Sequence, residues 1–185
     1  AIYTNDSTLN VNYTYLYRNS ARYGGAIYQT GASAAAEVAN TLVYSNTSNS
    51  GGLHKNAGAF TVAHVTLANN LVGAGFAGTA TVVTNTIAWG NTAGGFMIVP
   101  TLASCNIDQS GNAGVNVDPL FVSPGPGENY RLRASSPAID ACATGLPVDL
   151  DNKARPISAL FDMGAYEGTG EIYIYLPLVL RNHTN

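Results

Sequence analysis

The sequence predicts an all-β protein built as a β-solenoid, a stack of short coils whose strands pair in parallel with those of the next coil. The first observation behind this prediction is a short block that recurs with a period of about 20–27 residues. The second is that β-branched runs lie between glycines and asparagines, as in strands joined by tight turns. The third is the length of 185 residues, which is enough for one hydrophobic core.

The recurring block contains one aliphatic residue and closes with an asparagine. The aliphatic members are Leu16, Leu42, Leu67, Ile87 and Ile107, and the closing asparagines are Asn19, Asn46, Asn70, Asn91 and Asn112. Because parallel stacking brings equivalent positions into register, we expect the aliphatic side chains to stack inside the solenoid. We expect the asparagines to form an amide ladder at a turn, since Asn tolerates the left-handed conformation and bonds to nearby backbone.

Each coil is expected to contain short strands, such as those over 8–11 and 80–84, with glycines at its corners. No segment sustains the apolar period of a capped helix. We therefore predict about five coils over residues 1–117, a capping segment of the same domain over residues 118–168, and a C-terminal strand tail over residues 169–185.

Most acidic residues lie in the predicted cap: Asp118, Asp140, Asp149, Asp151, Asp162 and Glu167. We expect them to accept hydrogen bonds from backbone N–H groups and to pair with arginines, in a structure that covers the exposed end of the solenoid. A weaker interpretation is a calcium site at Asp149 and Asp151, since hard cations prefer oxygen ligands. That pair lacks the glycine and the distal glutamate of an EF-hand. No other metal and no cofactor are expected.

The two ends of the chain are candidates for assembly. Ala1-Ile2-Tyr3 matches Ala26-Ile27-Tyr28, so the sequence starts inside a repeat. Either upstream coils have been removed from a longer precursor, or the first coil exposes an open edge that can template another chain. The tail is a run of high β-propensity, which needs a groove on its own solenoid or on another subunit. The candidate assembly residues are Ala1, Ile2, Tyr3, Ile172, Tyr173, Ile174, Tyr175, Leu176, Leu178, Val179 and Leu180.

Composition restricts the partners and the location. Charged residues make up 10%, against about 25% in typical domains. The net charge of −3 and the pI of about 5.4 give no electrostatic basis for nucleic-acid binding. No apolar run reaches the roughly 18 residues of a membrane span. The scarcity of lysine favours residence outside the cell, where a disulfide between Cys105 and Cys142 is slightly favoured over two buried thiols.

Two stretches carry a resemblance to known families. Gly24-Gly25-Ala26-Ile27-Tyr28, with the blocks ending in Asn, resembles the GGAI and FxxN repeats of polymorphic outer-membrane-protein-like β-helices. Asp118-Pro119-Leu120-Phe121 and Asp162-Met163-Gly164-Ala165-Tyr166-Glu167 are similar to the C-terminal segment of bacterial secreted β-helix proteins of the "choice-of-anchor" type. The resemblance implies a right-handed parallel β-helix, export, and a cell-surface or extracellular location, without a defined catalytic activity. Cys142 stands where that family usually has Gly, which makes a partner at Cys105 more plausible.

Our first functional hypothesis is a secreted structural β-solenoid that binds copies of itself, in a filament-like assembly formed by end-stacking or by donation of the C-terminal strand. One alternative is a carbohydrate-binding or adhesive module that contacts cell-surface glycans through tyrosines. Another is a polysaccharide lyase-like enzyme or its remnant, but the coil acids Asp6, Glu37 and Asp108 lie in different coils. No catalytic residue is therefore assigned, and His54 and His64 are expected to be surface imidazoles.

Overall fold

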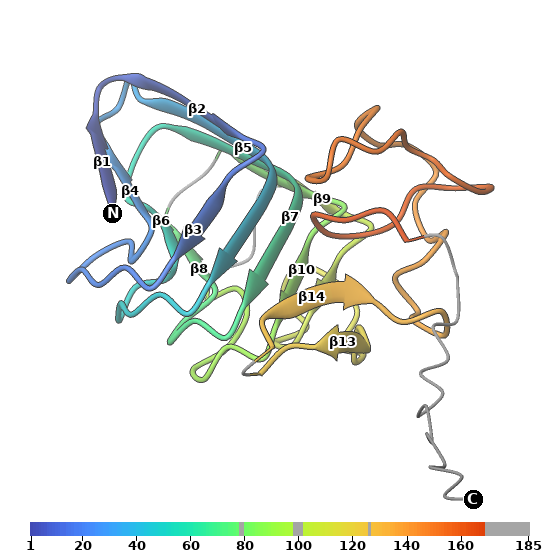
Figure 1. Ribbon diagram of the computed structural model, residues 1–185. Helices are drawn as coiled ribbons and strands as arrows, with labels where there is room; N and C mark the ends of the chain where they lie inside the picture. The colour runs from blue at the N-terminus through green and yellow to red at the C-terminus, as the bar shows by residue number, and fades with distance from the viewer. Residues whose placement is uncertain (78–79, 98–101, 126, 169–185) are drawn as a thin grey trace, which may run out of the picture.

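The computed structural model describes residues 1–168 except 78–79, 98–101 and 126. Within these residues the regular structure is β-strand without helix, and parallel strands stack into a solenoid of about four turns (Figure 1). The predicted all-β solenoid is thus confirmed. The strand predicted for residues 169–185 lies outside the described residues.

Three walls of parallel strands enclose the solenoid interior. The first wall contains β1 (Ile2–Asn5), β4 (Ile27–Thr30), β6 (Leu53–Lys55) and β8 (Ala74–Phe76). The second contains β2 (Thr8–Asn12), the first halves of β5 (Ala35–Tyr44) and β7 (Ala59–Ala68), β9 (Thr81–Thr84) and β11 (Leu102–Ser104). The third contains β3 (Tyr15–Tyr17), the second halves of β5 and β7, β10 (Ile87–Trp89) and β12 (Ile107–Asp108).

Residues with positive φ turn the chain from the second wall to the third. Within the long strands β5 and β7, Asn40 and His64 have φ values of 42° and 52°. Tyr13, Asn85 and Cys105 take the same conformation at the equivalent corners of the other coils. L-residues adopt this region rarely, and Asn is among those that tolerate it best. One repeated backbone conformation therefore builds one edge of the solenoid.

The strand register divides the predicted aliphatic stack into two columns. Leu16, Val43, Leu67 and Ala88 are paired in one column, and Leu42, Thr66, Ile87 and Ile107 in another. The first column faces the interior core, and the aliphatic members of the second belong to an outer core. The prediction of a single inner stack was therefore wrong. Neighbouring strand residues face opposite sides, so a one-residue error in register exchanges inside for outside.

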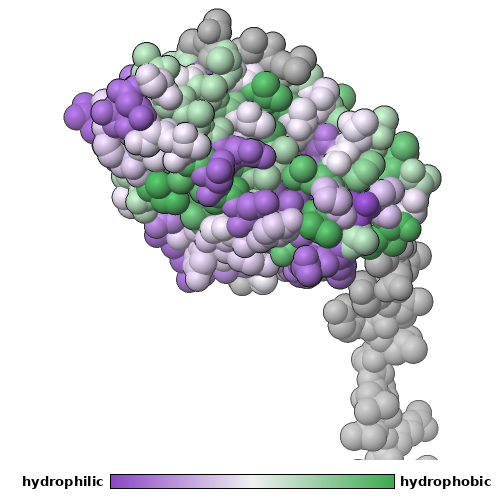
Figure 2. All heavy atoms as spheres, turned by 90° about the horizontal axis from the view of Figure 1, so that it is seen from above, coloured by the Kyte–Doolittle hydropathy of each residue, from purple (hydrophilic) through white to green (hydrophobic). Residues whose placement is uncertain are grey.

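The interior core is closely packed and mostly apolar. Val38, Val62 and Val83 line it from the second wall and are fully buried. The outward residues of that wall include Glu37 and Thr61, so its strands alternate in the way expected for a wall with one solvated face. Figure 2 looks onto the side where β2 and β5 lie uppermost in Figure 1, and hydrophilic and hydrophobic residues are interspersed on it.

Residues 118–168, here called the flank segment, lie along the side of the solenoid. Their only strands among the described residues are the antiparallel pair β13 (Phe121–Ser123) and β14 (Asn129–Leu132). The segment covers the outer face of the third wall, where it buries Leu42, Ile87 and Ile107 in the second core. The prediction that it covers the solenoid end was wrong, because its apolar residues pack against the outward column of the third wall.

Candidate functional site

Four of the five predicted asparagines form a ladder at the turn after the third wall. The backbone N and the Nδ2 atom of Asn19 both donate to Asn46 Oδ1, at 3.0 Å each. Asn46 donates to Asn70 in the same way, and Asn70 donates to Asn91. Asn46, Asn70 and Asn91 also donate from Nδ2 to a main-chain carbonyl of the preceding coil. Each asparagine therefore links neighbouring coils and satisfies buried backbone groups.

The fifth position of the ladder is held by a glutamine. Asn91 N donates to Gln109 Oε1 at 2.8 Å, and Gln109 Nε2 donates back to the carbonyl of Asn91 at 2.6 Å. Asn112 lies elsewhere, with its backbone N bonded to Asp108, so its predicted place in the ladder was wrong. Asn112 was predicted because it continues the series of asparagines. The structure instead uses Gln109, which lies earlier in the chain and carries its amide group on a longer side chain.

A buried carboxylate closes the C-terminal end of the interior core. Asp108 pairs with Ala88 in the inward column and is fully buried. Its Oδ1 accepts hydrogen bonds from the backbone N of Ser110 and of Phe96, at 3.0 and 3.3 Å. Its Oδ2 accepts from the backbone N of Asn112 and of Ala113, at 2.8 and 2.9 Å. The closing loop, residues 109–117, thus folds over the core around one charge that is fully supplied with donors.

Among the described residues, the first coil lies at the opposite end of the stack. β1 pairs only with β4, and β2 and β3 pair only with β5. Their inward residues Ile2, Leu9 and Leu16 are only partly buried, whereas Ile27 in the next coil is fully buried. Ile2 and Tyr3 lie opposite Ile27 and Tyr28, as the matching tripeptides predict. Unpaired backbone and uncovered core therefore coincide at this edge.

Nothing in the first-coil strands protects this edge. The sequences of β1, β2 and β3 are IYTN, TLNVN and YLY, with no proline and no charged residue. In natural proteins, prolines, charged residues or bulges usually prevent an edge strand from pairing with another chain. The exposed large hydrophobic side chains of the first coil are tyrosines: Tyr3, Tyr13, Tyr15, Tyr17 and Tyr23. The edge thus combines strand-pairing groups with amphipathic rings that are common in protein interfaces.

Tyrosines and a histidine gather on the outer face of the first wall. The Tyr28 ring lies 5.3 Å from the His54 ring and 5.6 Å from those of Tyr3 and Tyr23. Arg22 lies 5.1 Å from the centre of the Tyr23 ring. The column ends at Gly75, which pairs with His54. These rings, defined here as the aromatic cluster, leave much of Tyr3 and Tyr23 exposed.

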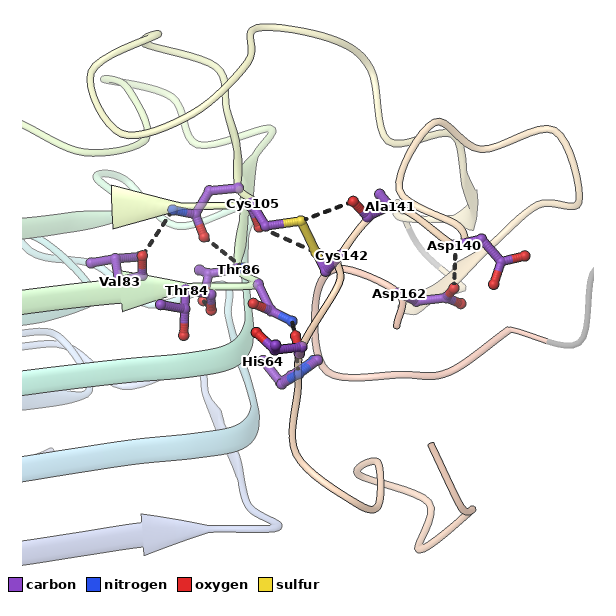
Figure 3. Close-up of a disulfide and its surroundings, with 12 residues drawn as sticks. His64, Val83, Thr84, Thr86, Cys105, Asp140, Ala141, Cys142 and Asp162 are labelled. Atoms are coloured by element: carbon purple, nitrogen blue, oxygen red, sulfur yellow. Dashed lines mark hydrogen bonds between the residues drawn. A yellow bond between two sulfur atoms is a disulfide. The ribbon is translucent and has the colours of Figure 1, made fainter. Parts of the chain in front are cut away.

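A disulfide fastens the flank segment to the last coil. Cys105 and Cys142 are bonded, with their Cα atoms 5.7 Å apart (Figure 3). Cys105 occupies the positive-φ corner after β11, and Cys142 lies in the flank segment. The bond closes a separation of 37 residues. In a loop-entropy model such a link stabilises a fold by about 3–4 kcal/mol.

His64 is the centre of a buried polar contact between the solenoid and the flank segment. Its Nε2 accepts a hydrogen bond from the backbone N of Leu146 at 3.1 Å and lies 3.0 Å from Asn85 Nδ2. Its Nδ1 lies against Arg155 Nη1. Burial, reinforced by the Arg155 guanidinium, lowers the pKa of His64 to about 3, so the ring is neutral. The expectation of a surface imidazole was therefore wrong for His64, whereas His54 is half-buried.

A cavity of about 230 Å³ lies beside this contact. Its lining includes the hydroxyl-bearing side chains of Thr84, Ser104 and Thr144, next to His64 and Leu146. Both His64 nitrogens contact the flank segment, at Leu146 and Arg155, so the imidazole helps to hold that segment on the solenoid. Sequence reasoning missed this site, since His64 and Arg155 are 91 residues apart. The Asn-Thr pairs at 40–41 and 85–86 could have predicted the corner between the second and third walls, where His64 lies, but not its contact with the flank segment.

The acids of the flank segment hold its loops together. Asp162 accepts hydrogen bonds from the backbone N of Asp140 and of Gly168, and burial raises its pKa. Glu167 accepts from the backbone of Ile157 and Asp162 and lies 3.7 Å from Arg155 Nη1; burial raises its pKa as well. Two carboxylates therefore depend on backbone donors, in the manner that the sequence suggested.

The two residues of the weak calcium candidate have separate protein partners. Asp149 is fully buried and accepts from the backbone N of Lys153 and of Glu167. Asp151 pairs with Arg131 at 2.5 Å. Among the described residues, no group of three or more His, Cys, Asp or Glu side chains has the arrangement of a metal site. The structure thus uses both carboxylates to brace the flank segment.

The described part of the chain contains no helix that is long and apolar enough to cross a membrane. The assembly candidates between Ile172 and Leu180 lie outside the described residues. Comparisons with protein-family models, curated proteins and solved structures give no match. The β-solenoid agrees with the fold implied by the resemblance to outer-membrane-protein-like β-helices, while no family model supports the repeats or the anchor segment of that family.

Proposed function

We propose that the protein is a secreted structural β-solenoid that assembles with copies of itself through the outer edge of its first coil. The observation that carries this proposal is the coincidence of three unpaired strand edges with the partly exposed core residues Ile2, Leu9 and Leu16. A partner strand at this edge would bury apolar surface and satisfy backbone groups in one step. The expected role is architectural, at the cell surface or outside the cell.

Two features support a location outside the cell. The Cys105–Cys142 disulfide is typical of oxidising compartments. The surface carries few charges, with 10% charged residues in the chain, and is polar mainly through amides and hydroxyls. Fractionation of the producing cells tests this location. Recovery of the protein only from the cytosol, with both thiols reduced, would contradict it.

The predicted routes of assembly are end-stacking and donation of the C-terminal strand, either of which would give filament-like growth if it repeats. Both routes need an acceptor edge, and the first coil is the proposed acceptor. The residues predicted to form the donor strand, 172–180, lie outside the described residues. The acceptor can therefore be tested through residues of the first coil alone.

A proline at position 10 tests the acceptor edge. Ala35 N donates to the carbonyl of Ser7, so strand alternation directs the backbone N–H of Asn10 away from β5. Asn10→Pro removes this outward donor without removing a bond to β5, and Asn10→Thr keeps the donor as a matched control. Light scattering and electron microscopy should find assemblies for the parent chain and Asn10→Thr, and monomers for Asn10→Pro. A parent chain that stays monomeric at high concentration would overturn the proposal.

The aromatic cluster favours carbohydrate binding as a second candidate function. Its exposed rings Tyr3 and Tyr23 are 63% and 45% accessible, and Arg22 adds a charged donor beside them. Sugars stack on aromatic rings and bind polar groups at their margin. Glycan-array binding that is lost in Tyr3→Ala/Tyr23→Ala but kept in Tyr17→Ala would support this function. Silence across the array would count against it.

A further inference from the structure

The cavity beside His64 has two sides that face each other. One side is the outer face of the second wall, where Ala63, Thr84 and Ser104 are register neighbours in successive coils. Val83 is fully buried in the interior core, so strand alternation directs Thr84 outwards. The other side is formed by residues 144–146 of the flank segment. The solenoid and the flank segment therefore build this cavity together.

The two sides are held together by covalent and hydrogen bonds. Cys105, which follows β11 directly, is bonded to Cys142 in the flank segment (Figure 3). Residues 144–146 accept a hydrogen bond from Asn85 Nδ2 at 2.6 Å and donate one to His64 Nε2 at 3.1 Å. A cavity whose sides are fixed in advance loses little conformational freedom when a ligand binds, which favours affinity.

Several polar groups that line the cavity have no hydrogen-bond partner in the described part of the chain. They include the hydroxyls of Thr84, Ser104 and Thr144. Asn85 is only 5% exposed, and its Nδ2 is fixed by donation to a carbonyl, so its Oδ1 is left as an acceptor. Ser104 and Thr144 are exposed, so solutes can reach these groups from the solvent. The cavity thus presents three hydroxyls and one amide oxygen to a ligand.

The ligand that fits this lining is uncharged. Among the described residues, no Asp, Glu, Lys or Arg side chain lines the cavity. The Arg155 guanidinium contacts His64 but is fully buried, where it donates to the carbonyl of Gly164 and lies 3.7 Å from Glu167. His64 itself is kept neutral by burial and by the charge of Arg155, which lower its pKa to about 3. A charged ligand would lose hydration here without gaining a counter-charge.

We propose that this cavity binds one residue of a neutral sugar. Its volume of about 230 Å³ is below the roughly 300–1,000 Å³ of pockets for drug-sized molecules, so it suits a single small ring. It holds at least about seven waters, more than four polar side chains can order. A sugar displaces these waters, exchanges hydrogen bonds with the lining hydroxyls and lays C–H groups on Ala63 and Leu146. The site is separate from the aromatic cluster and does not depend on the assembly proposed above.

Nuclear magnetic resonance of the full chain tests the site. The probes are glucose, galactose, mannose and N-acetylglucosamine, each as the free sugar and as its methyl glycoside. The glycosides show whether the end of a glycan chain is accepted or only a free monosaccharide. At least one probe should shift the amide signals of Thr84 and Gly145 at millimolar concentrations. Thr84→Val should weaken binding about 3–10-fold, since it removes one hydroxyl and keeps the shape.

The matched control is Thr61→Val, because Thr61 faces outwards on β7 without lining the cavity, and its binding should equal that of the parent chain. Ala63→Leu fills the cavity and should abolish binding, with thermal unfolding as the check that the variant is folded. Tyr3→Ala/Tyr23→Ala should leave binding unchanged. No shift with any probe, ordered solvent only, or binding that is undiminished in Thr84→Val and Ala63→Leu would overturn the inference and leave self-assembly untouched.

Discussion

At the scale of single residues, the solenoid depends on a few buried polar side chains whose partners are backbone groups. Asp108 is the clearest case, because its two carboxylate oxygens accept four backbone N–H donors at the end of the core. Such a group is costly to bury alone and strongly stabilising when it is fully paired. The sequence marked it only as one of three isolated acids in the coils.

Replacement of Asp108 by Asn should destabilise the protein by about 2–4 kcal/mol, since the new amide group directs its own hydrogens at backbone donors. The free energy of unfolding in denaturant measures the effect. Asp118→Asn is the matched control, because that exposed carboxylate accepts one backbone bond, from Leu120 N. Equal losses in the two variants would show that closure of the core does not depend on the buried charge.

His64 makes the stability depend on pH. Its pKa in the folded protein is about 3, below the ordinary value of 6.5, so the unfolded chain binds a proton first as the pH falls. The stabilisation is complete above about pH 6.5 and is lost as the pH falls towards 3. Asp162 and Glu167, whose pKa values are raised by burial, act in the opposite direction. The variant His64→Asn isolates the histidine, because Asn occupies the equivalent corners at 40 and 85.

Between about pH 7 and about pH 5, the parent chain should lose roughly 2 kcal/mol more stability than His64→Asn. Denaturant unfolding across this range gives the two slopes. His54→Asn should keep most of the parent slope, since His54 lies on the outer face of β6, away from the flank segment. Identical slopes for the parent chain and His64→Asn would contradict the assignment of a neutral His64.

At the scale of elements, the repeated blocks made the coils predictable. The flank segment has no such repeat and was hard to place from the sequence. The closing asparagines predicted the ladder because each coil needs, at the same turn, an amide group that hydrogen-bonds to the next coil. The aliphatic column failed at Leu42 and Ile87, since a strand covered on both faces has apolar residues on both. Its inner and outer sides then look alike in the sequence.

The Asn ladder should behave as a structural unit of the stacked coils. Asn70→Ala removes the acceptor of two bonds from Asn46 and the donor to the carbonyl of Val43, so we expect a loss of about 2–4 kcal/mol. Asn49→Ala, at an exposed position two residues from the next turn glycine, should cost less than about 0.5 kcal/mol. Thermal and denaturant unfolding compare them. If Asn70→Ala left the free energy of unfolding unchanged, the ladder would not be a source of stability.

At the scale of the whole molecule, the described residues form an asymmetric stack, with the closing loop at one end and the flank segment along one side. The sequence indicated the register of the first coil, because Ala1-Ile2-Tyr3 repeats Ala26-Ile27-Tyr28. It did not place residues 118–168, whose contacts with His64, Asn85 and Cys105 join distant parts of the chain. Long-range docking of this kind leaves no local period to read.

The central claim is that the outer edge of the first coil binds another copy, and amide hydrogen exchange of that edge tests it most directly. The Asn10 N–H is directed outward, while the Leu9 N–H is directed towards β5. If the edge is an interface, exchange at Asn10 slows as protein concentration rises, whereas exchange at Leu9 changes little. Exchange at Asn10 that is fast and independent of concentration up to the millimolar range would contradict the claim.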